Sequence, residues 1–465
     1  MGLEKQYCVI LAAGEGKRMN SSGSKVLCEV AFKPLLLWVI DAVRCAGMKD
    51  ICVVASGDDV RQAALGCEIV EQKERLGTGH AVLCAREKFA QRKGSILVLY
   101  GDAPFIDAEI IEESYDRHLA EDNDVTVISA IVPDARGYGR IFRSEGSMAA
   151  IIEEADCTDE QRRISEINTG AYWFKAQSLS SVLDEIGNSN AQGEYYLTDA
   201  VSLLLGEGKR AGCHIAMSSD IALGANTPRD LLMLNRIAKD KVISRLLDEG
   251  VRFINTDGIC IHPDTVIAPG TTVLPGCILK QGVVVGADCV LGPNTTLSNT
   301  KIGQRSVVDS CLCNDSVVGD DVRLGPWVQL RPGSVIGNEA KVGNFVEVKN
   351  SSVGTGTSVA HLTYVGDADV GAYCNFGCGT VFVNYDGEQK YRTVVKDYAF
   401  IGCNTNLVAP VTVGEGAYTS AGVTVTEDVP DGALAIGRAK QLNKPGWSQK
   451  KLEKYIQKKQ TDRSK

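Results

Sequence analysis

The chain has 465 residues, too many for a single hydrophobic core, and a typical domain length predicts about two to four domains. Its hydrophobic and charged fractions, 44% and 23%, are ordinary for a globular protein, while its formal charge of −9 disfavours a general binder of nucleic acid or anionic membranes, because phosphate backbones need a dense basic surface. The longest apolar stretch near the N-terminus, residues 34–40, is far shorter than the ~20 residues of a membrane span, and no targeting segment is evident.

The 16 cysteines are scattered along the chain and follow no signal peptide. This pattern favours reduced, mostly buried thiols in a cytoplasmic protein over a disulfide framework. The pair Cys311-x-Cys313 has no second Cys or His pair at zinc-like spacing. A structural metal site is therefore not expected there.

Short aliphatic runs alternate with amphipathic helical stretches through the first half of the chain. Strands are expected at residues 7–11, 50–55 and 95–100, the first followed by a Gly-rich turn and the others by Gly and Asp residues. Such alternation is typical of βαβ units around a mostly parallel sheet, and the strand ends of these sheets bind ligands. The first half therefore predicts a Rossmann-like α/β domain.

Residues 227–250 read as one helix that separates the two halves. Thr227 is the expected N-cap, Pro228 occupies the first helical position, and Gly250 is the expected C-cap. Apolar residues between them recur at helical spacing. We therefore expect residues 1–226 to form one domain, 227–250 a linker helix, and 251–465 a second domain.

Beyond residue 265 the aliphatic positions fall into a period of six. A short strand and a turn, stacked repeatedly with one aliphatic side chain per unit pointing inward, explain a strict six, whereas neither a helix nor a plain strand does. The register slips after the first run and then resumes. The runs are Ile267, Val273, Leu279, Val285, Leu291 and Leu297; Val318, Leu324, Leu330, Ile336, Val342 and Val348; Val353, Val359 and Val365; Val370, Phe376 and Phe382; and Ile401, Leu407, Val413, Thr419 and Val425.

Two segments depart from this period. Residues 383–399 break the repeat and are expected to project as a loop, a place where rigid scaffolds often carry function. The basic, polar tail after about residue 445 is expected to fray.

The string Leu11-Ala12-Ala13-Gly14-Glu15-Gly16-Lys17-Arg18-Met19 directly follows the first expected strand. Gly14 and Gly16 let backbone N–H groups approach phosphates, and Arg18 and the nearby Lys25 supply positive charge for a triphosphate. A bare Gly-x-Gly also arises in any strand-to-helix turn, so the complete string carries the signal.

This string, with the downstream Lys25, resembles the sugar-1-phosphate nucleotidyltransferases. Its coupling to a hexapeptide solenoid is similar to the bacterial bifunctional N-acetylglucosamine-1-phosphate uridyltransferase/glucosamine-1-phosphate acetyltransferase family, over residues 5 to 447. The resemblance implies a Rossmann-like nucleotidyltransferase domain and a left-handed parallel β-helix. It also implies acetylation of glucosamine-1-phosphate by acetyl-CoA, then uridylylation of N-acetylglucosamine-1-phosphate by UTP, which supplies peptidoglycan and cell-envelope precursors.

The resemblance assigns roles to residues of the first half. Arg18 and Lys25 are implied as catalytic cations, and Asp102 and Asn226 as ligands of Mg²⁺, a cation usually held by few protein oxygens together with phosphates and waters. Gln72, Gly77 and Thr78 are implied to recognise uracil, and Gly139, Glu153 and Asn168 the N-acetylglucosamine moiety. The other implied nucleotide contacts are Leu11, Ala12, Ala13 and Gly14.

In the second half, His361 is implied as the general base that takes the amine proton during acetyl transfer, a task suited to imidazole. A lone His in a solenoid is otherwise a surface residue; the surrounding motif carries the assignment. The implied sugar-phosphate ligands are Arg331, Lys349, Tyr364 and Asn375. The implied acetyl-CoA contacts are Cys378, Asn384, Tyr385, Cys403, Ala421 and Arg438.

Four residues depart from the commoner family pattern. Lys17 stands where Thr is frequent, and Glu15 places an acid beside the phosphate turn. Cys378 and Cys403 stand where Ala and Ser are frequent, so hydrogen bonds there are expected from the backbone. A covalent acetyl-cysteine is the alternative to the favoured direct transfer.

Two other functions fit part of the sequence. One is a monofunctional ADP-glucose or dTDP-glucose type of nucleotidyltransferase whose solenoid only regulates, against which His361 argues. The other is a non-catalytic assembly subunit, against which Lys25 and Asp102 argue. The family resemblance further implies small-molecule substrates, no nucleic acid or membrane partner, and a homotrimer with a shared acetyl-CoA site.

Overall fold

The computed structural model describes residues 2–14 and 23–463. It divides into two compact units, one made of Met1–Asp248 with Ile259–Thr265 and the other of Glu249–Gly258 with Val266–Lys465. In the described ranges no helix is both long enough and apolar enough to cross a bilayer. Arg18, Glu15, Gly16 and Lys17 lie outside the described residues.

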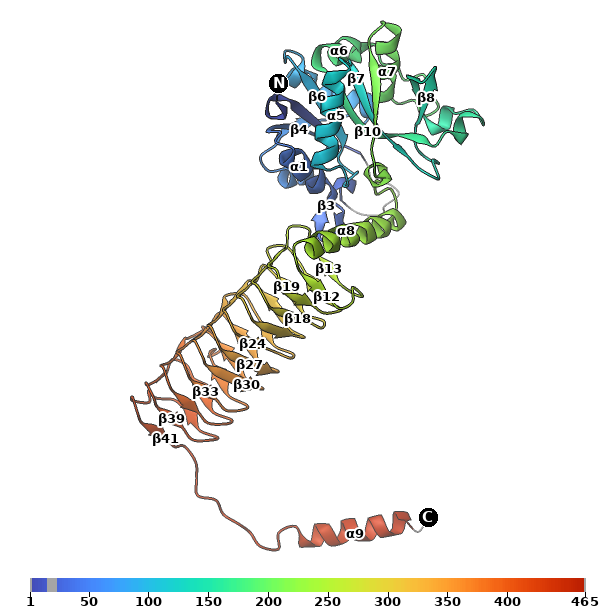
Figure 1. The fold of residues 1–465 in the computed structure, drawn as a ribbon. Helices are drawn as coiled ribbons and strands as arrows, with labels where there is room; N and C mark the ends of the chain where they lie inside the picture. Colours follow the sequence, from blue (N-terminus) through green and yellow to red (C-terminus); the bar gives the residue numbers. More distant parts are fainter. Residues whose placement is uncertain (1, 15–22, 464–465) are drawn as a thin grey trace. The chain divides into compact units, whose positions relative to one another are not determined.

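The first unit is built on a sheet with the strand order β11-β7-β10-β6-β1-β4-β5 (Figure 1). β1 pairs in parallel with β4 and β6, whereas β10 runs antiparallel to β6 and β7. A hairpin of β8 and β9 joins the sheet through β10. The strands are β1 (Tyr7–Leu11), β4 (Asp50–Ala55), β5 (Glu68–Glu71), β6 (Ser95–Tyr100), β7 (Val125–Ile131), β8 (Arg140–Ser144), β9 (Ser147–Ile152), β10 (Glu166–Lys175) and β11 (Ala211–Ile215), while β2 (Glu29–Val30) and β3 (Lys33–Pro34) form a separate two-stranded sheet.

Helices cover both faces of this sheet, so its central strands are apolar on both sides. Tyr7 and Val9 of β1 belong to one buried cluster, and the alternating Cys8 and Ile10 belong to the other. The three strands expected from the sequence are thereby confirmed. The helices are α1 (Leu35–Cys45), α2 (Asp58–Ala63), α3 (Thr78–Cys84), α4 (Arg86–Phe89), α5 (Ala108–Ala120), α6 (Ala176–Val182), α7 (Leu197–Gly206) and α8 (Pro228–Asp248).

Helix α8 begins where the sequence predicts. Thr227 caps it, because its hydroxyl accepts from the Asp230 N–H at 3.2 Å while Asp230 accepts from the Thr227 N–H at 2.8 Å. Its inward residues include Leu234, Ala238 and Leu246, all buried. Gly250, beyond its end, has φ +88°, a conformation that favours glycine.

The second unit is a left-handed parallel β-helix whose three faces are sheets of short strands (Figure 1). One sheet stacks β12 (Arg252–Phe253), β15 (Thr272–Val273), β18 (Val290–Gly292), β21 (Val307–Asp309), β24 (Arg323–Leu324), β27 (Lys341–Asn344), β30 (Ser358–His361), β33 (Asn375–Phe376), β36 (Phe400–Ile401), β39 (Tyr418–Thr419) and β41 (Leu434–Ala435). The second stacks β13 (Cys260–Ile261), β16 (Ile278–Leu279), β19 (Thr296–Ser298), β22 (Leu312–Asn314), β25 (Gln329–Leu330), β28 (Glu347–Lys349), β31 (Tyr364–Gly366), β34 (Val381–Val383), β37 (Asn406–Val408) and β40 (Thr424–Val425). The third stacks β14 (Val266–Ile267), β17 (Val284–Val285), β20 (Lys301–Ile302), β23 (Ser316–Val318), β26 (Ser334–Ile336), β29 (Ser352–Val353), β32 (Ala368–Val370), β35 (Thr393–Val395) and β38 (Thr412–Val413).

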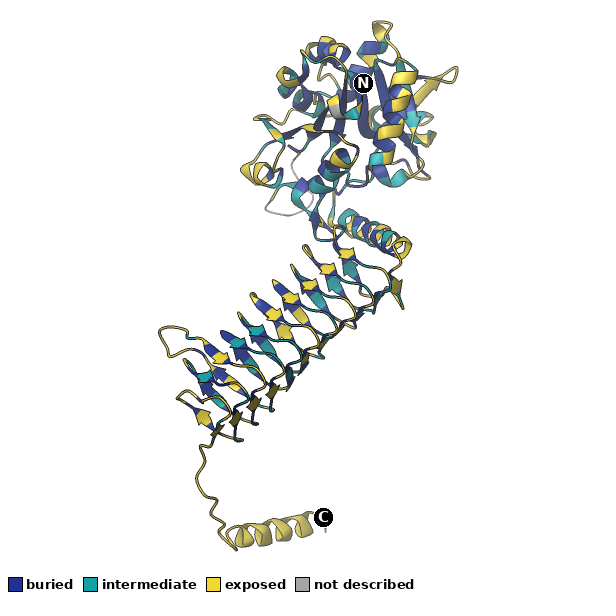
Figure 2. Cartoon of the chain, turned by 60° about the vertical axis from the view of Figure 1, so that its left-hand side comes forward, coloured by how far each residue is buried: buried dark blue, intermediate teal, exposed yellow. Residues whose placement is uncertain are grey.

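The six-residue repeat is the core of this β-helix. Every residue of the five runs is buried, and its neighbours along each strand alternate with it toward solvent (Figure 2). Where the period slips, Ile302, Val308 and Cys313 take the inward positions, because the turns between these strands are one residue shorter. The predicted solenoid, and with it the predicted fold class, is confirmed.

Two expectations for this unit were wrong in extent. The projecting loop comprises residues 384–392 rather than 383–399, because Thr393–Val395 forms β35 and pairs with β32, returning the chain to the solenoid. The tail does not fray throughout, since Gln449–Arg463 forms the helix α9, whose residues are good helix formers. All described residues of α9 are exposed.

Candidate active sites

The carboxyl ends of the parallel strands of the first unit open onto one cavity of about 600 Å³. β1, β4, β5 and β6 all end at the same edge, as expected for a ligand site of an open α/β sheet. The lining residues are Leu11, Ala13, Gly14, Lys25, Val26, Gln72, Arg75, Gly77, Thr78, Ala81, Tyr100, Asp102, Glu194 and Asn226. The structure therefore brings together most of the residues assigned to the nucleotide, while Ala12 is buried beside them.

The turn after β1 is fixed by backbone hydrogen bonds. The Ala12 N–H donates to Val54 at 2.8 Å, and the Leu11 carbonyl accepts from the Gly101 N–H at 2.9 Å. A Cβ added at Gly14 would meet nothing within 4 Å. The protein leaves open space at this glycine, as a backbone that receives phosphates requires.

Lys25, Asp102 and Asn226 form one polar cluster at this cavity. The Lys25 ammonium donates to the Asp102 carboxylate and, at 2.7 Å, to Asn226 Oδ1. Both assigned metal ligands thus already turn an oxygen toward a single cation, so their chemistry fits Mg²⁺ with most of its ligands taken from phosphates and water. Among the described residues no group of three or more His, Cys, Asp and Glu could hold a metal by itself.

The residues assigned to uracil line the same cavity. Gln72 is only 4% exposed, and its Nε2 donates to the Gly77 carbonyl at 3.2 Å. Gly77 has φ +115°, and a Cβ there would lie 2.6 Å from the Tyr195 carbonyl, so only glycine fits. The Thr78 hydroxyl accepts from the Leu197 N–H at 3.0 Å, which ties the start of α3 to α7.

Gly139, Glu153 and Asn168 are brought together from β8, β9 and β10. A Cβ on Gly139 would lie 3.3 Å from Glu153 Oε2, and the Asn168 N–H donates to the Gly139 carbonyl at 2.8 Å. Burial raises the pKa of Glu153, which accepts from the Thr198 hydroxyl at 3.1 Å. Carboxylate and amide groups in this setting suit sugar hydroxyls and an acetamide.

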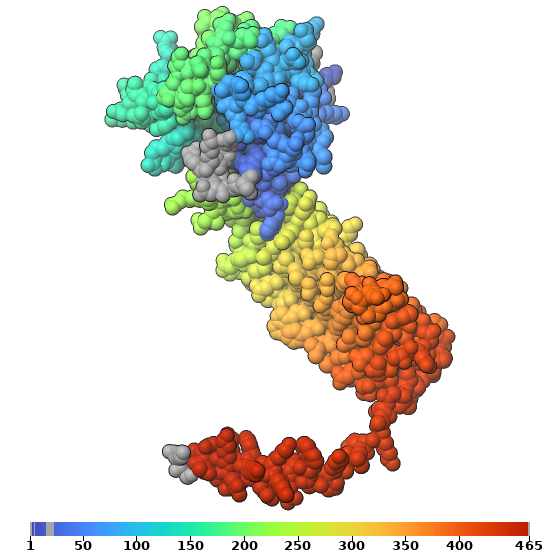
Figure 3. Space-filling view, turned by 180° about the vertical axis from the view of Figure 1, so that it is seen from behind, coloured from blue at the N-terminus to red at the C-terminus, as the bar shows by residue number. Residues whose placement is uncertain are grey.

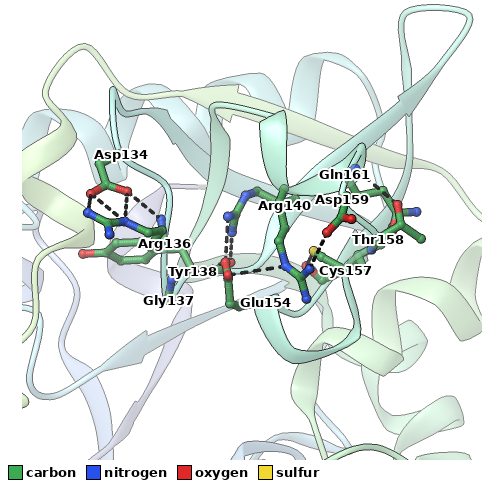
Figure 4. Close-up of polar contacts among 12 residues, drawn as sticks. Asp134, Arg136, Gly137, Tyr138, Arg140, Glu154, Cys157, Thr158, Asp159 and Gln161 are labelled. Carbon is green, nitrogen blue, oxygen red and sulfur yellow. Dashed lines mark hydrogen bonds and ion pairs between the residues drawn. The ribbon is translucent and has the colours of Figure 1, made fainter.

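A neighbouring ion pair holds this group in place (Figure 4). The Arg140 side chain is 1% exposed, and its Nη2 donates to Glu154 Oε2 at 2.6 Å. The same carboxylate accepts from the Gly137 N–H at 3.3 Å. Because Arg140 follows Gly139 and Glu154 follows Glu153, the pair fixes the backbone beside both of these residues assigned to the sugar.

Sequence reasoning missed several residues of this cavity. Arg75 reaches the Ser56 hydroxyl at 2.9 Å, and Ser56 donates to the Ala13 carbonyl at 3.1 Å, which links a second cation to the phosphate turn. Tyr100 and Glu194 also line the wall. Burial, then the charge of Glu153, raises the pKa of Tyr100 to about 12. A strand-end position was the only signal for Tyr100 in the sequence.

In the second unit, Arg331, Lys349 and Tyr364 stack on successive coils of one sheet. The Arg331 N–H donates to Val348 at 2.9 Å, and Glu347 is the partner of Tyr364 in the parallel register. Arg331 forms an ion pair with Glu347 at 2.8 Å. These three assigned sugar-phosphate ligands therefore share one face of the solenoid.

The projecting loop adds to the same face; it is the orange segment that stands out from the surface in Figure 3. At its base, Asn384 Nδ2 donates to Asp367 at 2.5 Å and lies 3.5 Å from the Tyr364 hydroxyl. Lys390, which the sequence analysis did not assign, lies against Lys349, and the hydrogen bond between the two side chains is the main cause that lowers the pKa of Lys349, with burial and the like charge of Lys390 next. The loop thus brings a further cation to the assigned phosphate ligands.

His361 and Asn375 belong to β30 and β33, in a different sheet from Lys349 and Tyr364. Both side chains are exposed. The only hydrogen bond to His361 from a side chain of the described residues is that of the Thr363 hydroxyl to its carbonyl, at 2.8 Å. Within the described part of this single chain, no hydrogen bond or ion pair joins the assigned base to Arg331, Lys349 or Tyr364.

The assigned acetyl-CoA residues follow the last coils. Cys378, Cys403 and Ala421 are stacked and exposed, and the Cys378 and Cys403 carbonyls accept from Asn404 and Gly422, each at 2.8 Å. Their carbonyls therefore hold the coils together. Both thiols are free, as are the other cysteines of the chain. Tyr385 is exposed on the loop, and Arg438 is exposed beyond β41.

Comparison with known proteins covers both units. The family model of the MobA-like NTP transferase domain matches residues 8–168, and that of the GMPPB C-terminal domain matches residues 261–357. The curated protein "Bifunctional protein GlmU" of Caldanaerobacter subterraneus subsp. tengcongensis is 43% identical over 97% of this chain and 99% of its own length. That of Bacillus subtilis is 44% identical over 95% and 98%, and that of Clostridium perfringens strain SM101 is 41% identical over the same shares.

Identity at this level runs through both units. This coverage excludes the possibility that only one half of the chain is related to these proteins. The chain therefore belongs to the family of bifunctional GlmU proteins, enzymes that combine glucosamine-1-phosphate acetyltransferase with N-acetylglucosamine-1-phosphate uridyltransferase.

Proposed function

We propose that residues 1–226 transfer UMP from UTP to N-acetylglucosamine-1-phosphate, and that residues 251–465 make this substrate by acetylating glucosamine-1-phosphate with acetyl-CoA. Residues 227–250 connect the two activities. The observation that carries the first part is the cavity lined by Lys25, Asp102 and Asn226 together with Gln72. Lys25 can neutralise the charge of a triphosphate, Asp102 and Asn226 can hold its metal cation, and the buried amide of Gln72 can bind a base.

In uridylyl transfer, a phosphate oxygen of the sugar phosphate attacks the α-phosphorus of UTP, and the bond to the pyrophosphate leaving group breaks. Lys25 and Arg18 neutralise the phosphates, while Glu153 and Asn168 orient the sugar. Mg²⁺, held by Asp102 and Asn226, supplies further neutralisation of phosphate charge when bound. Catalysis is then mainly positioning and charge stabilisation, without a covalent intermediate on the protein.

In acetyl transfer, His361 takes a proton from the amine of glucosamine-1-phosphate as the amine attacks the thioester carbon of acetyl-CoA. An amide bond forms, the C–S bond breaks, and CoA leaves as the thiol. Arg331 and Lys349 hold the sugar phosphate, and Tyr364 and Asn375 hold the sugar. Cys378, Asn384, Tyr385, Cys403, Ala421 and Arg438 bind acetyl-CoA, with direct transfer rather than an acetyl-cysteine.

We further propose that the chain acts as a homotrimer in the cytoplasm. The separation of His361 and Asn375 from Lys349 and Tyr364 on different faces of the solenoid supports a site completed by a neighbouring copy. Such an arrangement lets the base of one copy meet the phosphate ligands of another. Sedimentation of the purified chain tests this directly, and a monomer with full acetyl-transfer activity would contradict it.

One assay tests the whole proposal. The purified chain is supplied with glucosamine-1-phosphate, acetyl-CoA, UTP and Mg²⁺, and UDP-N-acetylglucosamine is measured by chromatography. We expect product only when all four are present. Replacing glucosamine-1-phosphate and acetyl-CoA by N-acetylglucosamine-1-phosphate restores it. Product formed without acetyl-CoA from glucosamine-1-phosphate, or none in the complete mixture, would contradict the proposal.

A further inference from the structure

One histidine of the first unit has no assigned role, and it contacts Gln72, the glutamine proposed to bind uracil. His80, on α3, places its Nδ1 3.0 Å from Gln72 Nε2. The same Nε2 also donates to the Gly77 carbonyl at 3.2 Å. Gln72 is 4% exposed and lines the cavity, so its amide is held at one position between these two partners and the cavity.

The orientation of this amide follows from the chemistry of its partners. The Gly77 carbonyl only accepts hydrogen bonds, so the Gln72 atom beside it is the NH₂ group and not the oxygen. The second N–H of that group points at His80 Nδ1, which must therefore carry a lone pair. Both amide hydrogens are then used within the protein. Among the described residues none donates to Gln72 Oε1, which remains as an acceptor.

The surroundings of His80 fit the required tautomer. With Nδ1 accepting, its ring proton lies on Nε2, which is 3.9 Å from the Cys84 sulfur. The ring lines a small pocket of about 190 Å³ beside Leu76, Leu83 and Ile186. The aromatic ring of Tyr195 lies 6.4 Å from it, centroid to centroid. Asp184 also lines this pocket, and its carboxylate forms an ion pair with Arg86 at 2.5 Å.

Uracil and cytosine differ at the atom that such an acceptor meets. Uracil carries an N–H donor at N3, whereas N3 of cytosine is an acceptor. A site built to accept from N3 therefore pairs with uracil and places two acceptors against each other with cytosine. Sites that leave a buried polar group unpaired discriminate strongly between otherwise similar ligands.

We infer that His80 is a positioning residue that sets base specificity, since it holds Gln72 with its oxygen toward the N3–H of uracil. Without the Nδ1 acceptor, the amide retains only Gly77 to fix it and loses part of its preference for a donor. This inference rests on the proposed uridylyl transfer and adds to it the residue that selects the base.

The test compares UTP with CTP in the full-length chain. His80→Phe keeps a planar ring but removes the acceptor, and His80→Asn restores an acceptor at the equivalent δ position. We expect His80→Phe to lower the ratio of kcat/KM for UTP to that for CTP by about tenfold, mainly through a higher KM for UTP with little change in kcat. We expect His80→Asn to recover most of the ratio, and Cys84→Ala, the matched control, to keep it.

Acetyl transfer by the same preparations reports whether each variant is folded and active in its other unit. His80→Leu replaces His80→Phe if the larger ring prevents folding. An unchanged UTP-to-CTP ratio in an active His80→Phe or His80→Leu variant would overturn the inference alone. A wild-type chain without uridylyl transfer would overturn the proposed function as well. A ratio lost equally in Phe, Leu and Asn variants would show a packing role and overturn it too.

Discussion

The ammonium of Lys25 is hydrogen bonded to the carboxylate of Asp102, and the same ammonium lies 2.7 Å from Asn226 Oδ1. One ammonium thereby contacts both groups that we assign to Mg²⁺, and the Asp102 carboxylate balances its charge. The Lys25 and Asp102 side chains are mostly buried, at 13% and 22% exposed, so solvent screens neither charge well. When a divalent cation binds between Asp102 and Asn226, we expect Lys25 to turn toward the phosphates.

Replacing Asp102 by Ala removes the only carboxylate of this cluster. We expect uridylyl transfer to fall by about 10²- to 10³-fold, since charge stabilisation of the phosphates depends on it. Acetyl transfer should remain at the wild-type rate, because its residues lie in the other unit. Coupled assays of the two half-reactions measure this. Asp116→Ala, an exposed carboxylate on α5 of the same unit, is the control. Loss of both activities in a folded variant would refute independent sites.

The assignment of His361 is tested by His361→Ala. We expect acetyl transfer to fall by about 10²- to 10⁴-fold, the usual contribution of a general base, while uridylyl transfer is unchanged. Both rates are measured on one preparation. Thr363→Ala, which removes the hydroxyl that donates to the His361 carbonyl, is the control and should cost much less. An acetyl-transfer rate near wild type in His361→Ala would overturn the assignment.

The sequence predicts the solenoid well because one residue in six must be buried in every coil. That requirement repeats through the chain, so a single slipped coil, such as the one at Ile302, does not hide it. The end of the projecting loop was harder to place. Thr393 is buried and pairs with Ala368, yet nothing in the local composition separates it from the exposed residues before it. Its position depends on contacts with the preceding coil.

The sequence predicts some residues of the candidate sites but not others. Residues that sit on a motif, such as Gly14 and Lys25, could be named from the chain alone. His80, Arg75 and Lys390 could not, because each acts through a neighbour that is distant in sequence or that belongs to a folded turn. Only the fold brings their partners within reach.

Core stability of the solenoid is tested at Leu330, which is fully buried in the second run of the repeat. Leu330→Ala leaves a cavity between coils, and we expect it to lower the free energy of unfolding of this unit by about 2–5 kcal/mol. Urea denaturation followed by circular dichroism measures the change. Val335→Ala, an exposed residue of β26, should cost less than about 1 kcal/mol. Equal losses at the two positions would contradict the inward role of the repeat.

The contact between Lys349 and Lys390 predicts a pH dependence of acetyl transfer. A side-chain hydrogen bond with Lys390 is the largest cause that lowers the pKa of Lys349; burial, the charge of Lys390 and that of Arg331 lower it further, and Asp367 raises it. Lys349 must carry its proton to hold the sugar phosphate. As pH rises through this lowered pKa, the ammonium is lost, so KM for glucosamine-1-phosphate should rise at a pH below the usual range of a lysine.

Lys390→Gln removes the like charge and should return the pKa of Lys349 toward its ordinary value. The high-pH limb of log(kcat/KM) for acetyl transfer then moves to higher pH, although kcat/KM at neutral pH falls because one cation is missing near the phosphate. Lys396→Gln, an exposed lysine paired with Asp431, is the control and should leave the limb in place. A limb that stays unmoved in Lys390→Gln would mean that Lys349 is not the titrating group, since relief of repulsion can only raise its pKa.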